Sequence, residues 1–365
     1  MKKALITGIT WQDWCYLAEF LLEKWYEVHW IRRRASSFNT TRIDFLMQDE
    51  SIYKDNLFLH YWDMTDGANI MRLVSEIRPD EVYNLAAQSH VHISFQIPEY
   101  TTNCDAMWTL RLLEAIRICG LIDHCKYYQA STSELFWWMN YNRPEKWYNE
   151  DSPMHPRSPY WCAKLYAMRI VKNYKESYNM FSCNWILFNH ESPIRWEIFV
   201  TRKITIAVSK ISLWLQEKLI LWNLNAKRDR WHAKDYVKAM RLMLQQKSAE
   251  DYVISTWISN TVRDFVNWSF EEAWIIIRWE WNWFEEKWYN TKNWRCIVEV
   301  DSKYFRPAEV EFLLWDSSKA RKNLWRKPTY DVKSICSEMV KSDINKFNQM
   351  DILKRHWYKF LNQYE

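Results

Sequence analysis

The chain has 365 residues, enough for one large domain or two ordinary domains with substantial cores. Its 50 basic and 45 acidic side chains leave a formal net charge of +5 and are interspersed, which argues against a nucleic-acid-binding or membrane-surface protein. No window approaches the roughly 18 apolar residues of a membrane span, and the N-terminal apolar run is too short for a signal peptide. We therefore expect a cytoplasmic protein with no membrane or nucleic-acid partner.

Strand-like and helix-like segments alternate through the first half of the chain. The predicted strands are Ala4–Thr7, Glu27–Arg32, Leu57–Tyr61, Glu81–Asn84, Lys126–Ala130 and Cys183–Leu187. The helix-like segments between them include Tyr16–Lys24, Met71–Ile77 and Thr109–Cys119. This order predicts an α/β fold with a doubly wound parallel (Rossmann) sheet.

The alternation weakens beyond about residue 190. Helix-like runs at Thr201–Gln216, Lys234–Gln246 and Val332–Lys341 are separated there by irregular aromatic segments. This pattern predicts a smaller C-terminal α/β domain that binds the substrate. We place the cofactor-binding Rossmann domain at residues 1–188 and the substrate-binding domain at 189–365, with interleaved segments such as 222–260 returning to the first domain.

The turn after the first predicted strand reads G-I-T-W-Q-D-W, with Gly8, Trp11 and Trp14 on the spacing of a G-x-x-G-x-x-G fingerprint. In dinucleotide-binding turns one glycine makes the turn and another admits the pyrophosphate to the backbone amides. The third lets the helix pack closely on the strand. Only Gly8 is glycine here, so the segment by itself is a weak indication of a cofactor site.

The second predicted strand ends in Arg32, Arg33 and Arg34, where an NAD-binding protein usually carries an acidic residue. Arginine at this place favours the 2′-phosphate of NADP, although a solvated basic turn would have the same sequence. Asp63 follows the third strand, where a carboxylate could reach the adenine edge.

Tyr160 and Lys164 lie four residues apart on a helix that we expect to begin near Tyr160. This spacing puts both side chains on one face, so the ammonium can lower the pKa of the phenol and let it move a proton near neutral pH. The pair alone proves little in a chain rich in Tyr and Lys. Its place in the fold matters more, because Thr132 and Glu134 follow the preceding strand. Thr132 could bind the reacting hydroxyl, and Glu134 could act as a second base.

With these residues in place, the chain resembles the extended short-chain dehydrogenase/reductases and, within them, the GDP-mannose 4,6-dehydratase family along nearly its whole length. The matching segments include RRRASSFNT, DEVYNLAAQSHV, YQASTSELF, LFNHESP and YFRPAEVE. RRRASSFNT and LFNHESP are far more specific than the Tyr/Lys pair, which the whole superfamily shares. The resemblance implies NADP as cofactor, GDP-mannose as substrate and a homodimer or homotetramer.

The resemblance also implies a mechanism. NADP+ would accept hydride from C4 of the mannosyl ring while Thr132, Tyr160 and Lys164 handle the hydroxyl proton. Glu134 would remove the C5 proton, water would leave from C6, and the hydride would return to C6, giving GDP-4-keto-6-deoxymannose. The implied cofactor contacts are Gly8, Ile9, Thr10, Trp11, Gln12, Asp13, Arg32, Arg33, Arg34, Asp63, Met64, Leu85, Ala86, Ala87, Gln88, Ser89, Tyr100, Lys164, His190 and Arg195. The implied contacts to the nucleotide sugar are Asn189, Lys203, Arg228, Arg306 and Glu309.

Glycine and tryptophan occur in unusual numbers. The chain has three glycines and 26 tryptophans, whereas glycine is about 7% of an ordinary chain. Compared with the family that the chain resembles, Arg230 and Arg326 stand where the family has tryptophan. Tryptophan in turn stands where the family has glycine, at Trp11, Trp14, Trp25, Trp30, Trp62, Trp108, Trp137, Trp185, Trp196, Trp222, Trp231, Trp315 and Trp325.

Such replacements strain a fold. A side chain at a positive-φ position costs about 1–2 kcal/mol, and an indole forced into a packed interior adds about 1–3 kcal/mol. An alternative therefore stays open, namely a non-catalytic or cofactor-deficient glycine-to-tryptophan variant of the fold. Another nucleotide-sugar epimerase or dehydratase is a further alternative.

The eight cysteines are scattered without a C-x-x-C pair, which predicts reduced and mostly buried thiols. The nine histidines form no H-E-x-x-H pattern. We therefore expect no metal site.

Overall fold

The computed structural model describes residues 1–8, 12–32, 55–136, 148–280, 286–301, 315–324 and 328–355. The chain divides into two compact units, each assembled from three stretches of sequence. Unit 1 comprises Met1–His190, Ala233–Trp257 and Leu313–Thr329, and unit 2 comprises Glu191–His232, Ile258–Phe312 and Tyr330–Glu365. The division of labour between a cofactor domain and a substrate domain stays a prediction.

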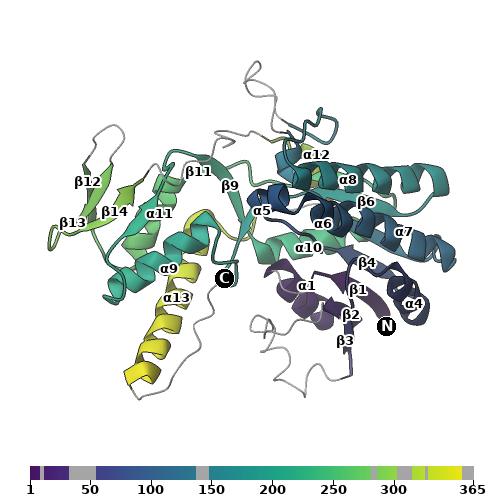
Figure 1. Ribbon diagram of the computed structural model, residues 1–365, viewed down its shortest axis with the longest axis horizontal. Helices are drawn as coiled ribbons and strands as arrows, with labels where there is room; N and C mark the ends of the chain where they lie inside the picture. The colour runs from purple at the N-terminus through teal and green to yellow at the C-terminus, as the bar shows by residue number, and fades with distance from the viewer. Residues whose placement is uncertain are drawn as a thin grey trace. The chain divides into compact units, whose positions relative to one another are not determined.

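Unit 1 is built on a seven-stranded sheet with the order β10-β6-β5-β4-β1-β2-β3, in which all neighbours are parallel (Figure 1). The strands are β1 (Lys2–Thr7), β2 (Tyr26–Arg32), β3 (Leu57–Tyr61), β4 (Glu81–Asn84), β5 (Lys126–Ala130), β6 (Ser182–Ile186) and β10 (Tyr252–Val253). The strand order reverses at β1, which pairs with both β2 and β4. The predicted doubly wound parallel sheet is confirmed, and five of the six predicted strands agree within one residue.

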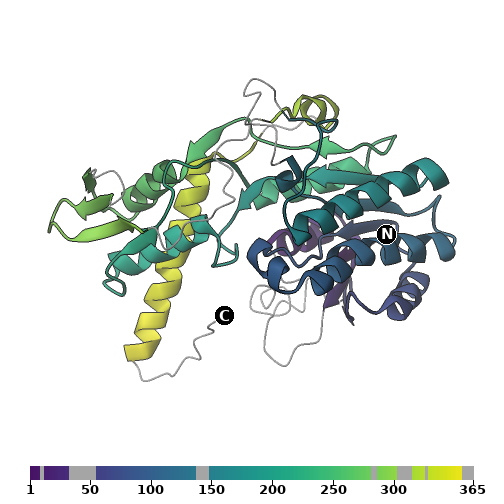
Figure 2. The ribbon, with the colours of Figure 1, turned by 45° about the horizontal axis from the view of Figure 1, so that its top comes forward.

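Helices cover both faces of this sheet (Figures 1 and 2). On one face α1 packs against α10, and on the other α7 packs against α4 and α8. The helices of unit 1 are α1 (Gln12–Glu23), α4 (Gly67–Ile77), α5 (Val91–Gln96), α6 (Pro98–Thr102), α7 (Trp108–Ile118), α8 (Pro159–Tyr178), α10 (Ala233–Leu244) and α12 (Ser318–Leu324). A π-helical turn, η1 (Asn103–Met107), joins α6 to α7, and a 3-10 helix, η2 (Ser133–Phe136), follows β5.

The helix that carries Tyr160 begins where the sequence provides a cap. The side chain of Ser158 accepts a hydrogen bond from the backbone N of Trp161 at 3.1 Å, which pairs one of the first N–H groups of α8. Pro159 occupies the first helical position, where its missing N–H costs nothing. The prediction of a helix beginning near Tyr160 is therefore confirmed, and its cap holds the start of the helix in a defined place.

In its described residues, unit 2 has three helices and strands that belong to two small sheets. Its helices are α9 (Val200–Ser212), α11 (Val262–Glu272) and α13 (Val332–Arg355). One sheet has the order β12-β13-β14-β8 and comprises β8 (Leu219–Leu221), β12 (Ile277–Glu280), β13 (Lys287–Asn290) and β14 (Cys296–Val300). In addition β9 (Lys227–His232) pairs antiparallel with β11 (Ser259–Thr261). The short strand β7 (Asn189–Glu191) spans the sequence boundary between the units. The predicted smaller α/β part is confirmed, with α13 longer than expected.

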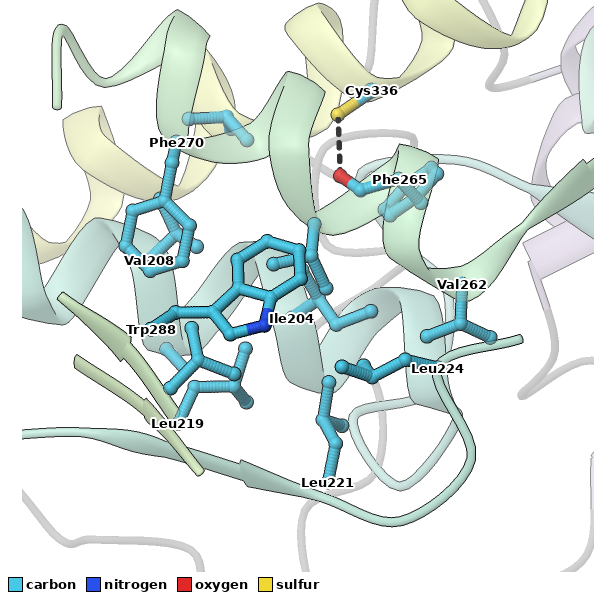
Figure 3. Close-up of a cluster of buried hydrophobic side chains, with 14 of the residues drawn as sticks. Ile204, Val208, Leu219, Leu221, Leu224, Val262, Phe265, Phe270, Trp288 and Cys336 are labelled. Carbon is cyan, nitrogen blue, oxygen red and sulfur yellow. Dashed lines mark hydrogen bonds between the residues drawn. The ribbon is translucent and has the colours of Figure 1, made fainter. Parts of the chain in front are cut away.

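Unit 2 has its own hydrophobic core, in which Trp288 is fully buried (Figure 3). Apolar side chains of α9 and α11, among them Ile204, Val208 and Phe265, surround this indole. The indole N–H donates to the Glu286 Oε1 at 2.6 Å, so its one polar atom is paired. The thiol of Cys336 on α13 donates to the backbone oxygen of Phe265 at 3.8 Å, which links α13 to α11.

All eight cysteines are free thiols, and five of them are buried. The prediction of reduced, mostly buried thiols is confirmed, with Cys162 as the exposed exception. In the described part of the chain, no helix combines the length and apolar character needed to cross a membrane.

Candidate active site

The turn between β1 and α1 brings the backbone of two strand ends into close contact at Gly8. Gly8 has φ +87°, and a Cβ added there would lie 2.7 Å from the Ala86 Cα and N atoms. Backbone at that distance cannot move aside as a flexible side chain could, so only glycine fits. Ile9, Thr10 and Trp11, which complete the predicted turn, lie outside the described residues.

Buried hydrogen bonds hold the carboxyl ends of β1 and β4 together beside this turn. The Thr7 hydroxyl donates to Asn84 Oδ1 at 2.7 Å and accepts from the backbone N atoms of Leu85 and Ala86, both at 3.2 Å. The Asn84 side-chain amide donates to Gln129 Oε1 on β5 at 2.8 Å. The point where the strand order reverses is therefore a rigid polar seam, and open α/β sheets bind ligands at such a point.

The first turn of α1 contacts the segment after β6. The Asp13 Oδ2 lies 2.6 Å from the Nε2 of His190, and the amide of Gln12 donates to the His190 backbone oxygen at 2.7 Å. The Nδ1 of His190 bonds the backbone oxygen of Phe188 at 2.8 Å. Three of the predicted cofactor contacts thus converge on one place in unit 1.

Trp14, in the first turn of α1, packs against β2. Its side chain is fully buried beneath α1 and stacks on Trp30 of β2, with ring centroids 4.5 Å apart and planes 9° from parallel. Neither indole Nε1 has a hydrogen-bond partner among the described residues. At the position where a glycine would let the helix pack closely on the strand, two indoles fill the space.

The predicted adenine side of the site is held by local contacts. Asp63 follows β3, and its Oδ1 accepts from the backbone N and the hydroxyl of Thr65 at 2.9 and 2.7 Å. The backbone oxygen of Met64 accepts from Arg111 at 3.2 Å. Arg32 is the last residue of β2, whereas Arg33 and Arg34 lie outside the described residues.

The segment from Leu85 to Ser89 follows β4 and carries five of the predicted cofactor contacts, including the half-buried Ala87. The backbone N of Gln88 donates to Asp105 Oδ1 at 2.7 Å, and the Gln88 amide oxygen accepts from the hydroxyl of Thr101 on α6 at 3.2 Å. The hydroxyl oxygen of Ser89 is buried without a partner in the described chain. Tyr100, also predicted to contact the cofactor, is half-buried on α6.

Thr132 and Tyr160 lie together between β5 and α8. Tyr160 is 7% exposed, and its phenol shares a side-chain hydrogen bond with Thr132. Burial, together with the negative charges of Glu134 and Asp105, raises the pKa of Tyr160 well above its usual value. The pKa of Tyr160 is therefore raised and not lowered as expected from the sequence, because burial and the two carboxylates dominate.

Lys164 is 3% exposed on the same face of α8 as Tyr160. Its ammonium donates to the backbone oxygen of Ala130 at 3.1 Å, at the end of β5, and lies 5.9 Å from the centre of the Tyr160 ring. Burial lowers the pKa of Lys164, and the carboxylate of Asp105 opposes that effect. Strand and helix thus hold the ammonium near the phenol without a direct bond between them.

Glu134 lies on η2, directly after the strand that precedes α8. The indole N–H of Trp161, the neighbour of Tyr160, donates to the Glu134 Oε2. The backbone N of Glu134 donates to the Thr132 hydroxyl oxygen at 3.3 Å. Thr132, Glu134, Tyr160 and Lys164, predicted from separate segments, are therefore brought into one cluster.

The predicted contacts to the nucleotide sugar are spread over both units. Asn189 opens β7 in unit 1, Lys203 lies on α9 and Arg228 on β9, both in unit 2. Arg195, a predicted cofactor contact, is also in unit 2, where its Nε lies 3.0 Å from Glu191 Oε2 and its guanidinium covers the ring of Phe199. Arg306 and Glu309 lie outside the described residues.

The sequence analysis missed two residues of the cluster. Asp105 bonds the Gln88 backbone and acts on both Tyr160 and Lys164, and Trp161 binds Glu134. The signal for Asp105 was available: it is an acidic residue at the start of a segment that reads as an apolar helix. Trp161 had no such signal, because an aromatic residue in α8 is expected to pack in the core.

Comparison with known proteins identifies the relatives of the chain. A family model described as GDP-mannose 4,6 dehydratase matches residues 5–339. The GDP-mannose 4,6-dehydratase of Yersinia enterocolitica is 53% identical and is matched over 98% of each chain. The human GDP-mannose 4,6 dehydratase is 51% identical over 93% of this chain and 91% of its own.

Solved structures of similar fold include several nucleotide-sugar enzymes. The UDP-glucose 4-epimerase of Thermotoga maritima, solved with UDP-glucose, has a TM-score of 0.76 at 19% identity and covers 94% of this chain and 99% of its own. The dTDP-glucose 4,6-dehydratase of Bacillus anthracis, solved with NAD, has a TM-score of 0.75 at 18% identity and covers 96% and 98%. At these identities the likeness concerns the fold.

Proposed function

The chain belongs to the GDP-mannose 4,6-dehydratase family, and we propose that it is a lyase that converts GDP-mannose into GDP-4-keto-6-deoxymannose. The observation that carries this proposal is the cluster of Thr132, Glu134, Tyr160 and Lys164. Oxidation of a hydroxyl needs one acid–base group, and elimination of water needs a second. The cluster offers both, because Tyr160 and Glu134 each have a hydrogen bond with Thr132.

The reaction needs a nicotinamide cofactor, which supplies the acceptor and later the donor of a hydride when it is bound. The described residues fit such a group. Gly8 makes the required turn, and the Asp13 Oδ1 and the Ser89 hydroxyl oxygen are buried without partners in the described chain. Buried polar atoms of this kind are expected to pair with a ligand. Lys164 and His190 would be further contacts to the cofactor.

NADP, and not NAD, is the form that we propose. Its support is the sequence Arg32-Arg33-Arg34 at the end of β2, since guanidinium groups pair well with a 2′-phosphate. NADPH and NADH are titrated separately into the protein while energy transfer from tryptophan to the nicotinamide is followed. Saturation by NADPH at a lower concentration than NADH supports the proposal, and a preference for NADH contradicts it.

Thr132 and Tyr160 would share the proton of the reacting C4 hydroxyl. Their mutual hydrogen bond places both oxygens where one substrate hydroxyl could meet them. The ammonium of Lys164 would stabilise the phenolate as it forms, which counteracts the burial that now raises the pKa of Tyr160. With its pKa raised, the phenol of Tyr160 is protonated near neutral pH.

Glu134 would remove the C5 proton and pass a proton to the leaving C6 hydroxyl. It is fixed by the Trp161 indole and by its own backbone bond to Thr132, so it has one position relative to Tyr160. We expect Glu134→Gln to slow dehydration by about 10²- to 10⁴-fold, the usual contribution of a general acid–base group. GDP-mannose is incubated with the variant and the 4-keto-6-deoxy product is quantified.

Trp161→Phe is the matched control, because it removes the indole N–H from Glu134 and leaves the carboxylate in place. This variant should lose far less dehydration activity than Glu134→Gln. Equal activity of Glu134→Gln and the unmodified protein would contradict the role of Glu134 as the second base.

For the nucleotide sugar we propose Asn189, Lys203, Arg228, Arg306 and Glu309, as the resemblance implies. Cations suit a pyrophosphate, and a carboxylate suits a guanine edge. Lys203 lies in the first turn of α9, and Arg228 is half-buried on β9. A homodimer or homotetramer in the cytoplasm is likewise a proposal, to be tested by sedimentation of the purified protein.

The competing function is a non-catalytic member of the family, and a specific observation favours it. Trp14 and Trp30 fill the space under α1 at two positions where the family has glycine. Absence of any saturable nicotinamide signal in a folded, monodisperse sample would support this alternative. If replacement of Trp11 and Trp14 by glycine restores binding, the turn is the cause of the loss.

A further inference from the structure

Asp105 is a buried acid that the proposed reaction does not use. It lies in the middle of the π-helical turn η1 and is 2% exposed. Its Oδ1 accepts from the backbone N of Gln88 at 2.7 Å, and its Oδ2 is buried with no hydrogen-bond partner in the described part of the chain. A π-turn inserts one residue into a helix and redirects the side chains around it, often at functional sites.

The turn η1 packs against α8, which carries Lys164. Asp105 is the one charged side chain found to act on Lys164 within the described residues. Lys164 in turn favours the ionised form of Asp105, against the burial that raises the pKa of that carboxyl to about 7. Asp105 and Lys164 are therefore two buried groups of unit 1 with opposite charges, each of which favours the ionised form of the other.

Other charged groups near η1 have different roles. Tyr160 of α8 feels the charge of Asp105, and Glu134 of η2 acts on Tyr160. Arg111 of α7 bonds the side chain of Asn103 at 2.7 Å, at the opposite end of the turn, and Glu99 of α6 is exposed. None of these groups can replace Asp105 as the anion for Lys164.

We propose that Asp105 is a positioning residue, whose carboxylate holds the Lys164 ammonium and ties it to the predicted cofactor loop through the backbone of Gln88. Its Oδ1 accepts from the backbone of this loop, its Oδ2 is buried without a hydrogen-bond partner among the described residues, and the positive charge of Lys164, on the helix that packs against η1, favours its ionised form. The active-site role of Lys164 rests on the proposed function, whereas the coupling itself is a property of the folded chain.

The coupling can be measured without substrate or cofactor. The pKa of Lys164 is followed by NMR in protein labelled at the lysine side-chain carbon, with Lys164→Met identifying the signal. Asp105→Asn keeps the shape and the acceptor oxygen but removes the charge. We expect the pKa of Lys164 to fall by about one unit or more, because desolvation is then unopposed.

Asp251→Asn is the matched control. Asp251 is a half-buried acid of unit 1 that also accepts from a backbone N, that of Asn184 at 2.7 Å, yet it does not act on Lys164. An unchanged pKa of Lys164 in Asp105→Asn overturns the proposal. An equal shift in both variants also overturns it, because the effect would then be general.

A reciprocal measurement serves if Asp105→Asn does not fold. In Lys164→Met the pKa of Asp105, followed by NMR of its carboxyl carbon, should rise above its value in the unmodified protein, since the lysine charge no longer opposes burial. No rise contradicts the coupling. If both pKa values shift as expected but dehydration of GDP-mannose is unchanged in the variants, the coupling stands and the proposed function of the site is contradicted.

A separate observation concerns the backbone at tryptophan. Five of the seven non-glycine residues with positive φ in the described chain are tryptophans, namely Trp25, Trp214, Trp257, Trp274 and Trp294. All five are exposed, from 44% to 87%, so packing does not compensate the strain of a bulky side chain there.

Two of these tryptophans occupy a motif that the chain elsewhere fills with glycine. Gly120 follows α7 with φ 66°, its N–H bonds the oxygen of Arg117, and the next N–H bonds the oxygen of Ile116. Trp214 after α9 and Trp274 after α11 have φ 61° and 58° and the same pair of backbone bonds. This is the helix-ending motif in which glycine is the usual residue.

We infer that the native protein has glycine at these five positions. In the source organism the corresponding codon would be translated as glycine, whereas the sequence shows tryptophan because the codon has been read with a different genetic code. UGA is the candidate, since it differs by one base from the tryptophan codon UGG and by one base from the glycine codon GGA. The same reading would restore glycine at positions 11 and 14, in the turn beside Gly8.

The gene and the native protein test this inference. We expect the codons for Trp25, Trp214, Trp257, Trp274 and Trp294 to be UGA, and peptides from the source organism to have the mass of glycine at these sites. UGG codons, or peptides with the mass of tryptophan there, would overturn it. Gly120, encoded as ordinary glycine, is the internal control.

Discussion

At the scale of single residues, Tyr160 shows what the sequence could and could not predict. The spacing of Tyr160 and Lys164 predicted that they share a face of one helix, and the structure has them on one face of α8. The pKa direction was wrong, because it depends on Glu134 and Asp105, which come from other segments. The spacing of residues in the sequence determines which helix face they share. The electrostatic environment of a buried phenol depends instead on tertiary packing, which brings in charges from other segments.

Asp105 predicts a measurable pH dependence of stability. Its folded-state pKa, raised to about 7 by burial, exceeds the usual value for an unfolded Asp of about 3.9. Between these values the folded state binds the extra proton, so the free energy of unfolding falls as pH rises from about 4 to 7. Urea denaturation should show this slope weakened in Asp105→Asn. An unchanged slope in the variant would mean that Asp105 is not the group that titrates.

The exposed tryptophans with positive φ predict stabilising substitutions. Trp214→Gly and Trp274→Gly should each raise the free energy of unfolding by about 1 kcal/mol, because glycine adopts the left-handed conformation without strain. Denaturant titration measures the change. Trp214→Ala and Trp274→Ala are the controls, since alanine removes the indole but keeps a Cβ. If alanine stabilises as much as glycine, the backbone conformation is not the cause.

At the scale of elements, α1 and β2 are held apart by two indoles. Trp14 and Trp30 stack face to face, so each fills the space that the other would leave. Trp14→Gly alone should open a cavity and lower the free energy of unfolding by several kcal/mol, about 3–5 for an aromatic truncated in a core. The double change Trp14→Gly/Trp30→Gly should be less destabilising than the sum of the singles, because α1 can then approach the strand.

A double-mutant cycle with denaturant unfolding measures this coupling. Additive single changes would show that the helix does not move closer when both indoles are gone. Trp288→Ala in unit 2 measures the destabilisation from removing a single buried indole. Trp288 is also fully buried, but no second indole stacks on it among the described contacts.

The helices α9 and α13 are joined by a buried ion pair between Arg202 and Asp343, which are 4% and 0% exposed. Arg202→Met should destabilise the protein by about 3–5 kcal/mol, because it leaves the Asp343 carboxylate buried without its cation. Arg202→Met/Asp343→Leu should recover much of that loss. Thermal unfolding of the three proteins at one pH checks both statements. A double variant as unstable as the single one would contradict this account.

Predictability from sequence differed between elements for physical reasons. The strands of the seven-stranded sheet were predicted closely because they are short runs rich in β-branched and aromatic residues, separated by helix-like segments. The turn η1 was not predicted, because its one extra residue shifts the hydrophobic period over a single turn, which is too short a stretch to recognise in the sequence. The helix α13 is longer than predicted, because its second half is polar and its apolar stripe weakens after Val340.

At the scale of the whole molecule, the sequence predicted two domains with interleaved segments, but not every residue at which the chain passes from one unit to the other. The residues near 315 illustrate why. Trp315 belongs to unit 1, where it packs on Tyr148 and Phe136, yet it follows a long stretch of unit 2 in the sequence. A short segment that joins a distant core has no periodic pattern of its own, so only the structure identifies it.

This interleaving constrains the order in which the protein can fold as it leaves the ribosome. The chain passes from one unit to the other five times, and unit 1 lacks its last segment until Leu313–Thr329 has been synthesised. Nascent chains that stop before Leu313 should therefore remain open to protease, and chains that extend beyond Thr329 by the length of the exit tunnel should become resistant. Pulse proteolysis of stalled ribosome complexes would reveal the step. Translation must be almost finished before the N-terminal sheet can acquire its full protection.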